Sequence, residues 1–244
     1  MSTVIILGSG PGVSHARDQI KGAGQQIVAI NNAWQVRPDW DFHIHPEDFP
    51  AARRPDRLMP GQRIITAAEY VPLQNQLGGF VYAGGTMAFT AAYWALLALR
   101  PRVIAMIGCD MVYPASGQTH FYGTGSADPL RPDISLRCLE AKAARLMLLA
   151  AQQGCAMVNL STDAESRLVY PRATWAELAS AAPQAPAQIG SALAAEAALG
   201  YSVASGRYWE EAARFDPAAL DRIDTLWLHA AGIRDPRRQD PSVI

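Results

Sequence analysis

Polar side chains that could take part in catalysis follow short apolar segments of the chain. Asp110 comes just after the apolar segment 102–107, and His120 stands in the long polar loop that follows. A loop histidine with an ordinary pKa can accept a proton near neutral pH. A carboxylate at a strand end can hold a ribose, a sugar hydroxyl or a metal ion, or it can simply cap the next loop. We therefore interpret Asp110 and His120 as candidate site residues, with an ordinary surface histidine as the alternative for His120.

Aromatic side chains surround this histidine in the sequence. The loop 111–132 contains Tyr113 and the run Gln-Thr-His-Phe-Tyr-Gly, which includes Tyr122. Such rings could pack against a nucleobase or a sugar. The loop therefore predicts a histidine base flanked by aromatic rings.

The segment 3–12, Thr-Val-Ile-Ile-Leu-Gly-Ser-Gly-Pro-Gly, is the most informative stretch of the chain. An apolar run of this kind is typical of a buried parallel strand, and we expect a helix over 13–20. Glycines between a strand and a helix leave backbone N–H groups free to bind a phosphate. Gly8, Ser9 and Gly10 are therefore predicted nucleotide contacts. The alternative is a turn whose glycines serve only the backbone.

Departures from known motifs limit the classes of nucleotide that the site could bind. The dinucleotide fingerprint requires a third glycine where Val13 stands, and an acidic residue after the second strand where Asn31 and Asn32 stand. Carboxamides suit a nucleobase edge, a ribose or a sugar. No Walker-type G-x-x-x-x-G-K-[ST] motif is present. The sequence thus predicts a nucleotide site that does not serve NAD.

The third apolar segment carries a His-x-His pattern. Alternation places Asp41, His43 and His45 on one face of a strand, and Glu47 and Asp48 follow it. This set could bind a divalent metal ion, but it lacks a metal-ligand spacing, so we expect no metal site. His45, nearest the carboxyl end of the strand, is the candidate functional residue of this segment.

Apolar segments and helical segments alternate along the first two thirds of the chain. Helices are expected over 86–99 and over 133–154, the latter with Asp133 as N-cap and Gly154 as C-cap. The short apolar runs are 3–7, 27–30, 40–45, 63–67, 79–83, 102–107 and 155–159. This order predicts an α/β, Rossmann-like doubly wound fold with a mainly parallel sheet and helices on both faces.

The pattern changes after residue 160. A capping box at Thr174 and Glu177 and an N-cap at Asp216 before Pro217 predict helix starts. We expect a Rossmann-like nucleotide-binding domain over 1–169. Residues 170–244 are expected to form a helical appendage that serves as a lid or as the face of a homo-oligomer.

Composition limits the partners and the compartment. The formal net charge of −1 and the lack of a basic cluster argue against a nucleic-acid partner. Three cysteines without metal-ligand spacing suit a reducing, cytoplasmic compartment. We expect neither a signal peptide nor a transmembrane segment.

Five short motifs in order resemble a known group of enzymes. They are the Gly-x-Gly-Pro loop, Asn31, a Gly-Gly-Thr turn into an apolar helix, a strand ending in Gly-Cys-Asp, and Thr-His-Phe-Tyr-Gly. Their order resembles the bacterial CMP-sialic-acid-dependent sialyltransferases and related surface-glycan glycosyltransferases. It is also similar to a broader group related to the 6-hydroxymethylpterin diphosphokinases. The likeness covers about residues 3–172 and is weakest over 50–78.

The sialyltransferase resemblance implies a role for each matching residue. His120 corresponds to the catalytic base, while Tyr113 and Tyr122 are nearest to the hydroxyls that assist the departing CMP phosphate. His45 falls where the family has an asparagine near the reaction centre. The implied contacts to nucleotide, sugar or phosphate are Gly8, Ser9, Gly10, Asn31, Gly85, Thr86 and Ser161. The family needs no metal or other cofactor, and its substrates are a nucleotide sugar and a glycan or small-molecule acceptor.

Three alternatives from other classes stay open. A pterin-type diphosphokinase would need ATP and Mg²⁺, with carboxylates such as Asp41, Asp48 and Asp110 around the metal. A nucleotide-binding module without catalysis would leave His120 facing solvent. A purely structural partner protein would have no pocket at its strand ends.

Overall fold

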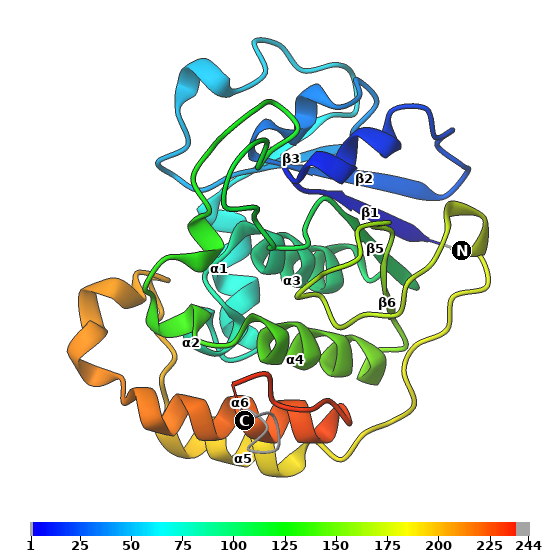
Figure 1. Cartoon of the computed structure of the whole chain (residues 1–244). Coiled ribbons are helices and arrows are strands. Elements are labelled where there is room, and N and C mark those ends of the chain that lie inside the picture. Colours follow the sequence, from blue (N-terminus) through cyan, green and yellow to red (C-terminus); the bar gives the residue numbers. More distant parts are fainter. Residues whose placement is uncertain (1, 238–244) are drawn as a thin grey trace.

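Six parallel strands form one sheet in the order β4-β3-β2-β1-β5-β6 in the computed structural model, which describes residues 2–237 (Figure 1). The strands are β1 Thr3–Leu7, β2 Gln25–Ile30, β3 Phe42–Ile44, β4 Arg63–Ile65, β5 Val103–Ile107 and β6 Ala156–Asn159. The predicted α/β, doubly wound fold is confirmed. Strand order reverses between β1 and β5, so this type of sheet opens a crevice at the carboxyl ends of those two strands.

One face of the sheet is covered by α-helices. They are α1 Ala67–Gln76, α3 Met87–Leu99 and α4 Leu139–Gln152, with the short α2 Phe80–Ala83 beside them. The α3 sequence is apolar nearly all round, as predicted, and the side chains from Ala88 to Leu96 are all buried. Residues Val4 and Ile6 of β1 belong to the apolar cluster that these helices form with the sheet.

The opposite face of the sheet is covered by short 3-10 helices and loops. The helices η1 Pro11–Ala16 and η2 Asn31–Gln35 pack there with Leu160 and the segment 173–181. The helix predicted over 13–20 is therefore wrong in type and length. Only Val13 and Ala16 of η1 reach the core, and Ile20 is 92% exposed, so no apolar face supports further turns.

Two further elements differ from the expectation. The apolar run 79–83 is the helix α2 rather than a strand, because Gly79 (φ 82°) and Gly84 (φ 91°) turn the chain at both of its ends. The helix predicted over 133–154 is divided. Asp133 caps the 3-10 helix η5 Ile134–Leu136 by accepting a hydrogen bond from the Ser135 amide at 2.8 Å. The extended backbone of Cys138 separates η5 from α4.

The remaining helices lie in loops or in the C-terminal part. The 3-10 helices are η3 Ala51–Arg53, η4 Asp128–Leu130, η6 Trp175–Glu177 and η7 Tyr208–Arg214. The predicted capping box of Thr174 and Glu177 opens η6. Asp216 caps α6, Pro217–Ala230, by accepting from the Ala218 amide at 2.9 Å.

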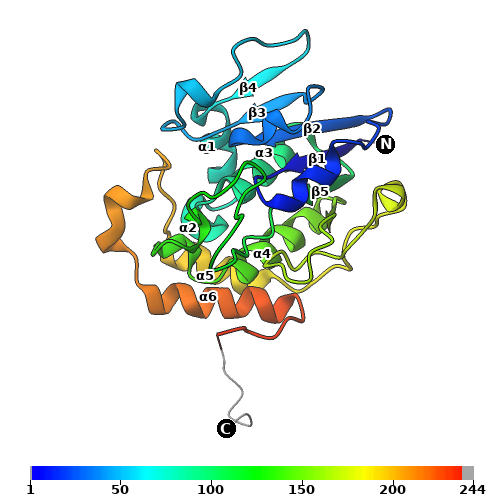
Figure 2. The same ribbon diagram turned by 45° about the horizontal axis from the view of Figure 1, so that its top comes forward.

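The C-terminal helices α5, Gly190–Leu199, and α6 form an outer layer against α4 (Figures 1 and 2). Two buried ion pairs join these layers: Lys142 with Asp224 at 2.8 Å, and Arg145 with Glu196 at 2.8 Å. Trp227 of α6 belongs to the same apolar cluster as the sheet. Residues 1 and 238–244, the outer ends of the two domains expected from the sequence, lie outside the described residues.

Over residues 2–237, no helix has the length and apolar character needed to cross a membrane.

We expect the Lys142–Asp224 pair to hold the helical layers together. Replacing Lys142 by Met should lower the free energy of unfolding by about 3 kcal/mol or more, because Asp224 would keep only the more distant Arg237, at 3.7 Å. Replacing both partners, Lys142 by Met and Asp224 by Leu, should recover at least half of this loss. Urea unfolding measures both variants.

The other lysine of the chain provides a matched control. Lys21 pairs with Asp41 near the surface, so Lys21→Met should cost less than about 1 kcal/mol. A double variant as unstable as Lys142→Met alone would contradict the assignment of the loss to an unpaired buried carboxylate.

Candidate functional site

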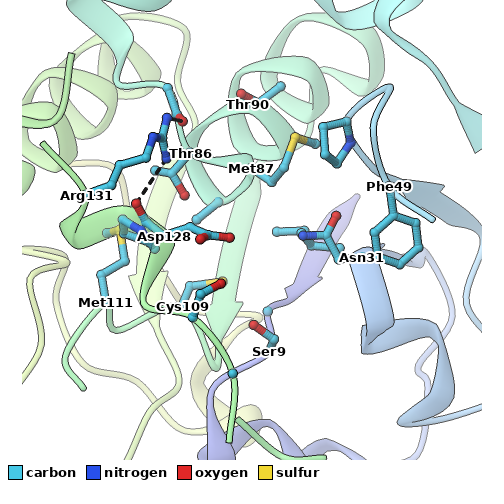
Figure 3. Close-up of a pocket in the computed structure, with 18 of the residues that line it drawn as sticks. Ser9, Asn31, Phe49, Thr86, Met87, Thr90, Cys109, Met111, Asp128 and Arg131 are labelled. Carbon is cyan, nitrogen blue, oxygen red and sulfur yellow. Dashed lines mark hydrogen bonds between the residues drawn. The ribbon is translucent and has the colours of Figure 1, made fainter. Parts of the chain in front are cut away.

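A cavity of about 1240 Å³ opens at the carboxyl ends of the central strands. It lies at the crevice between β1 and β5, where doubly wound sheets bind their ligands. The sequence-predicted residues that line it are Gly8, Ser9, Gly10, Asn31, Gly85, Thr86, Asp110, Tyr113, His120 and Tyr122. Figure 3 shows Ser9, Asn31 and Phe49 facing Asp128, Arg131 and Met111 across this cavity.

The glycine-rich loop after β1 uses most of its amides within the protein. The Gly8 amide donates to the Ile107 carbonyl at 2.8 Å, and the Gly10 amide donates to the Gly108 carbonyl at 2.8 Å. Added Cβ atoms would lie 2.3 Å and 3.0 Å, respectively, from the Gly108 carbonyl oxygen. These glycines therefore allow a close contact with the loop after β5. Of the three predicted contacts, only Ser9 has an amide without an acceptor among the described residues.

A second group of donors comes from the start of α3. Thr86, Met87 and Ala88 line the cavity, and no side chain caps this helix terminus. The first turn of α3 contains no acidic residue. The free N–H groups of a helix N-terminus favour an anion, so this end of the cavity suits a phosphate.

Gly85 lines the cavity, and both of its backbone polar groups are bonded within the protein. Its amide donates to Ser135 Oγ at 2.9 Å, and its carbonyl accepts from Arg131 Nη2 at 2.9 Å. A Cβ atom there would lie 2.2 Å from the Tyr208 hydroxyl. Gly85 therefore connects the start of α3 to Arg131, Ser135 and Tyr208, and it has no room for a side chain.

Asn31 is held in a left-handed backbone conformation (φ 51°) at the end of β2. Its carbonyl lies 2.8 Å from Nε2 of His43, which must donate because a carbonyl only accepts. Burial lowers the pKa of His43 to about 4, so the ring is neutral at physiological pH. Asn31 Oδ1 has no partner within the described part of the chain, which leaves an amide group for a ligand.

His45 and Ser161 do not line this cavity. The His45 ring is buried against Phe49, with centroids 5.3 Å apart, and its Nδ1 lies 2.8 Å from the Pro46 carbonyl. Phe49 does line the cavity. Ser161 lines a second, more open depression of about 790 Å³ together with His15 and Trp175.

His120 lies buried in the cavity wall, 5% exposed. Its Nδ1 is 2.8 Å from Thr119 Oγ1, while Nε2 makes no hydrogen bond with the described residues. Burial lowers the pKa of His120 below its ordinary value, and the nearby Asp128 opposes this shift. His120 is therefore neutral at pH 7, with one ring nitrogen available to a ligand.

Two tyrosines flank this histidine. The ring centroids of Tyr113 and Tyr122 lie 5.9 Å and 5.0 Å from that of His120. Burial raises the pKa of Tyr113 well above its usual range, so its hydroxyl remains a hydrogen-bond donor. Tyr122 is 45% exposed at the cavity edge.

Asp110 is held from behind by the last strand. Asn159 of β6 donates from Nδ2 to Asp110 Oδ1 at 3.1 Å, and Arg172 lies 4.0 Å from the same oxygen. This arrangement fixes the carboxylate at the cavity wall.

Segments far along the chain complete the wall, and sequence reasoning missed them. Tyr208 of η7 donates to Asp133 Oδ2 at 2.8 Å, and Arg131 pairs with the same carboxylate at 3.0 Å. Arg207 reaches Glu47 at 3.7 Å, which joins η7 to the loop after β3. No local sequence signal identifies Tyr208, because its role depends on a contact 75 residues away.

The charges of the lining are mainly negative. Six carboxylates line the cavity, against three arginines. Asp48, Asp128 and Asp163 make no ion pair with another described residue. Asp41, by contrast, lies away from the cavity, bound to Lys21 and to the Ile27 amide at 2.7 Å. Within residues 2–237, no three His, Cys, Asp or Glu side chains are grouped to hold a metal ion.

Comparison of the chain with protein-family models, curated proteins and solved structures finds no match. The resemblance to sialyltransferases and to pterin diphosphokinases therefore stays a prediction from the motifs.

We expect Gly8→Ala to lower the free energy of unfolding by about 1–3 kcal/mol, because the new Cβ would overlap the Gly108 carbonyl and Cys109 Sγ. Gly190→Ala is the matched control, since a Cβ at the start of α5 meets no atom within 4 Å. The control should be neutral or up to about 1 kcal/mol more stable. Thermal and urea unfolding compare the two, and equal effects would show that Gly8 is not confined by its neighbours.

His43 should make stability depend on pH. Its pKa is about 4 in the folded protein and about 6.5 in the unfolded chain, so the unfolded state binds more protons between these values. The contribution is complete above pH 6.5 and is lost as the pH falls towards 4, by roughly 3 kcal/mol in total.

The variant His43→Gln tests this dependence because it keeps a donor for the Asn31 carbonyl but has no titratable group. Urea unfolding at pH 7 and pH 4.5 should show a smaller loss for the variant than for the wild type. Identical losses would contradict the assignment to His43.

Proposed function

We propose that the protein transfers a sugar from a nucleotide-sugar donor, with a CMP-linked sugar as the first candidate, to an acceptor hydroxyl. The observation that carries the proposal is His120, a buried histidine that is neutral at pH 7. Its Nδ1 is in contact with Thr119 Oγ1, and its Nε2 makes no hydrogen bond with the described residues. A base in this state can take the proton of an alcohol, which a transferase requires of its acceptor.

The donor would span the cavity from Asn31 to α3. The free amide group of Asn31 and the adjacent ring of Phe49 suit a nucleobase or ribose (Figure 3). The uncapped start of α3 suits the phosphate, with the Ser9 amide as a further donor. Arg131 lies beside this helix start, where it donates to the Gly85 carbonyl at 2.9 Å and pairs with Asp133.

The reaction requires departure of the nucleoside monophosphate and deprotonation of the acceptor hydroxyl. The bond between the sugar carbon and the phosphate oxygen breaks, and its electron pair leaves with the nucleoside monophosphate. Tyr113, whose raised pKa keeps its proton, can donate a hydrogen bond to the oxygen that gains this charge. His120 accepts the proton of the acceptor hydroxyl as its oxygen bonds to the sugar carbon.

The acceptor in this proposal is a glycan or a small molecule in the cytoplasm. All three cysteines are buried as free thiols, which agrees with a reducing compartment.

A pterin-type diphosphokinase that uses ATP and Mg²⁺ is the second candidate. The carboxylates of Asp48 and Asp128 in the lining favour it, because Mg²⁺ is usually bound by one or two carboxylates together with substrate phosphates. Asp41 would take no part, because it lies outside the cavity in its pair with Lys21. Both candidates share a hydroxyl acceptor that His120 would deprotonate.

Replacing His120 by Gln tests the first candidate. With CMP-sialic acid as donor and a panel of saccharide acceptors, CMP release should fall by about 10²–10⁴-fold, since one general base contributes this much. The affinity for CMP, measured by calorimetry, should change less than about twofold. His229→Gln in α6 is the exposed control and should leave both quantities unchanged. Parallel loss of binding and turnover would make His120 a structural residue.

A further inference from the structure

The tight turn that carries His120 brings a second buried polar side chain against its ring. The amide and carbonyl of His120 exchange hydrogen bonds with those of Gly123, at 2.9 Å and 3.0 Å. The Phe121 amide donates to the Ser9 carbonyl at 3.0 Å, so the turn is attached to the glycine-rich loop. Thr119, 8% exposed, lines the cavity beside His120.

The Thr119 hydroxyl makes three contacts but has one proton. It accepts from the Gly125 amide at 2.9 Å, and it also lies 3.2 Å from the Gly125 carbonyl and 2.8 Å from His120 Nδ1. The carbonyl can only accept a hydrogen bond. If the hydroxyl donates to this carbonyl, Nδ1 must carry a proton and donate to Oγ1, and all three contacts are hydrogen bonds. If the hydroxyl donates to Nδ1 instead, no proton lies between Oγ1 and the Gly125 carbonyl oxygen, and this contact is not a hydrogen bond.

We propose that Thr119 is a positioning residue that holds neutral His120 with its proton on Nδ1, so that Nε2 is unprotonated towards the cavity. The catalytic meaning of this tautomer rests on the proposed function, in which Nε2 takes the proton of the acceptor hydroxyl. The tautomer itself is a property of the protein without substrate.

Gly125 keeps this arrangement close to the ring. A Cβ atom at this position would lie 2.9 Å from both Cε1 and Nδ1 of His120. A larger residue would therefore push the ring away from Thr119. The backbone of Gly125 provides both the donor and the acceptor that orient the hydroxyl.

The groups around the His120 ring keep it mainly neutral at neutral pH, so the position of its single proton matters there. Tyr113 and Tyr122 pack against it, and Asp128 is the charged group that acts on it. Asp128 favours the imidazolium form, but the effect of burial is larger, so the pKa stays below the ordinary value. The ring is then mainly neutral at pH 7.5, where one of its two nitrogens must be unprotonated.

Nuclear magnetic resonance of the ¹⁵N-histidine-labelled chain tests the proposal. The chain has five histidines, and the spectrum of His120→Gln identifies the signals of His120. At pH 7.5 we expect the shift of a protonated nitrogen at Nδ1 and of an unprotonated nitrogen at Nε2. A proton on Nε2 in the wild type would overturn the proposal, whatever the protein catalyses.

Two variants separate positioning from packing. Thr119→Ser keeps the hydroxyl and should keep the wild-type tautomer. Thr119→Val keeps the shape and should shift the ring towards the form protonated at Nε2, with the signals of His43 and His229 unchanged as a check of the fold. An unchanged tautomer in Thr119→Val would overturn the role of Thr119. If that variant does not fold, the wild-type and Thr119→Ser spectra still decide the tautomer.

Turnover provides the second readout. In the transfer assay, Thr119→Val should lower kcat roughly 10–100-fold, at or below the lower end of what one general base contributes, with little change in KM for the donor. Thr119→Ser should restore most of kcat. If the tautomer is as proposed but no nucleotide sugar is turned over, the proposed function fails while the assignment of the proton stands.

Discussion

The close approach of the loops after β1 and β5 is the contact on which the cavity depends. Gly8 and Gly10 lie against Gly108, and a Cβ atom at Gly108 would in turn lie 2.7 Å from that of Val13. These three positions cannot accept a side chain without moving the backbone. Their contact sets the paths of both loops at the crevice. It also places the Ser9 carbonyl where the Phe121 amide can reach it, which attaches the turn of His120 to the strand end.

The cavity that results has two chemically different sides. Asn31 and Phe49 offer an amide and a ring, and the start of α3 offers uncapped N–H groups. Another part of the lining carries His120 with its aromatic neighbours and the carboxylate of Asp128. This division suits a ligand whose anionic part binds at the helix terminus while a hydroxyl approaches the histidine. The carboxylates in the lining are the feature that favours the second candidate, a nucleotide bound together with Mg²⁺.

The sheet could be predicted well because apolar runs and their order reflect burial directly. Strands 3–7 and 102–107 and helix 86–99 are buried nearly throughout, and their sequences are apolar for that reason. The segments 13–20 and 79–83 were predicted wrongly, because their conformation depends on tertiary contacts and on glycine geometry rather than on periodicity.

The same distinction applies to the site. Strand-end positions such as Asn31 and Asp110 were found because parallel strands bring their carboxyl ends to one edge. In the glycine-rich loop, the amides of Gly8 and Gly10 bind the neighbouring loop, and the sequence could not show that only the Ser9 amide of these three stays free. Tyr208 and Arg131 were missed because they reach the cavity through contacts between distant segments.

Calorimetric titration of the wild-type protein with CMP, CDP, UDP, GDP and ATP, each with and without Mg²⁺, tests the central claim most directly. We expect saturable, metal-independent binding of a cytidine nucleotide, and thermal unfolding should then show a stabilisation of about 2.7 kcal/mol at a hundredfold excess over Kd. Binding of ATP alone, and only with Mg²⁺, would favour the diphosphokinase instead. The absence of binding for all five nucleotides would contradict a nucleotide site in this cavity.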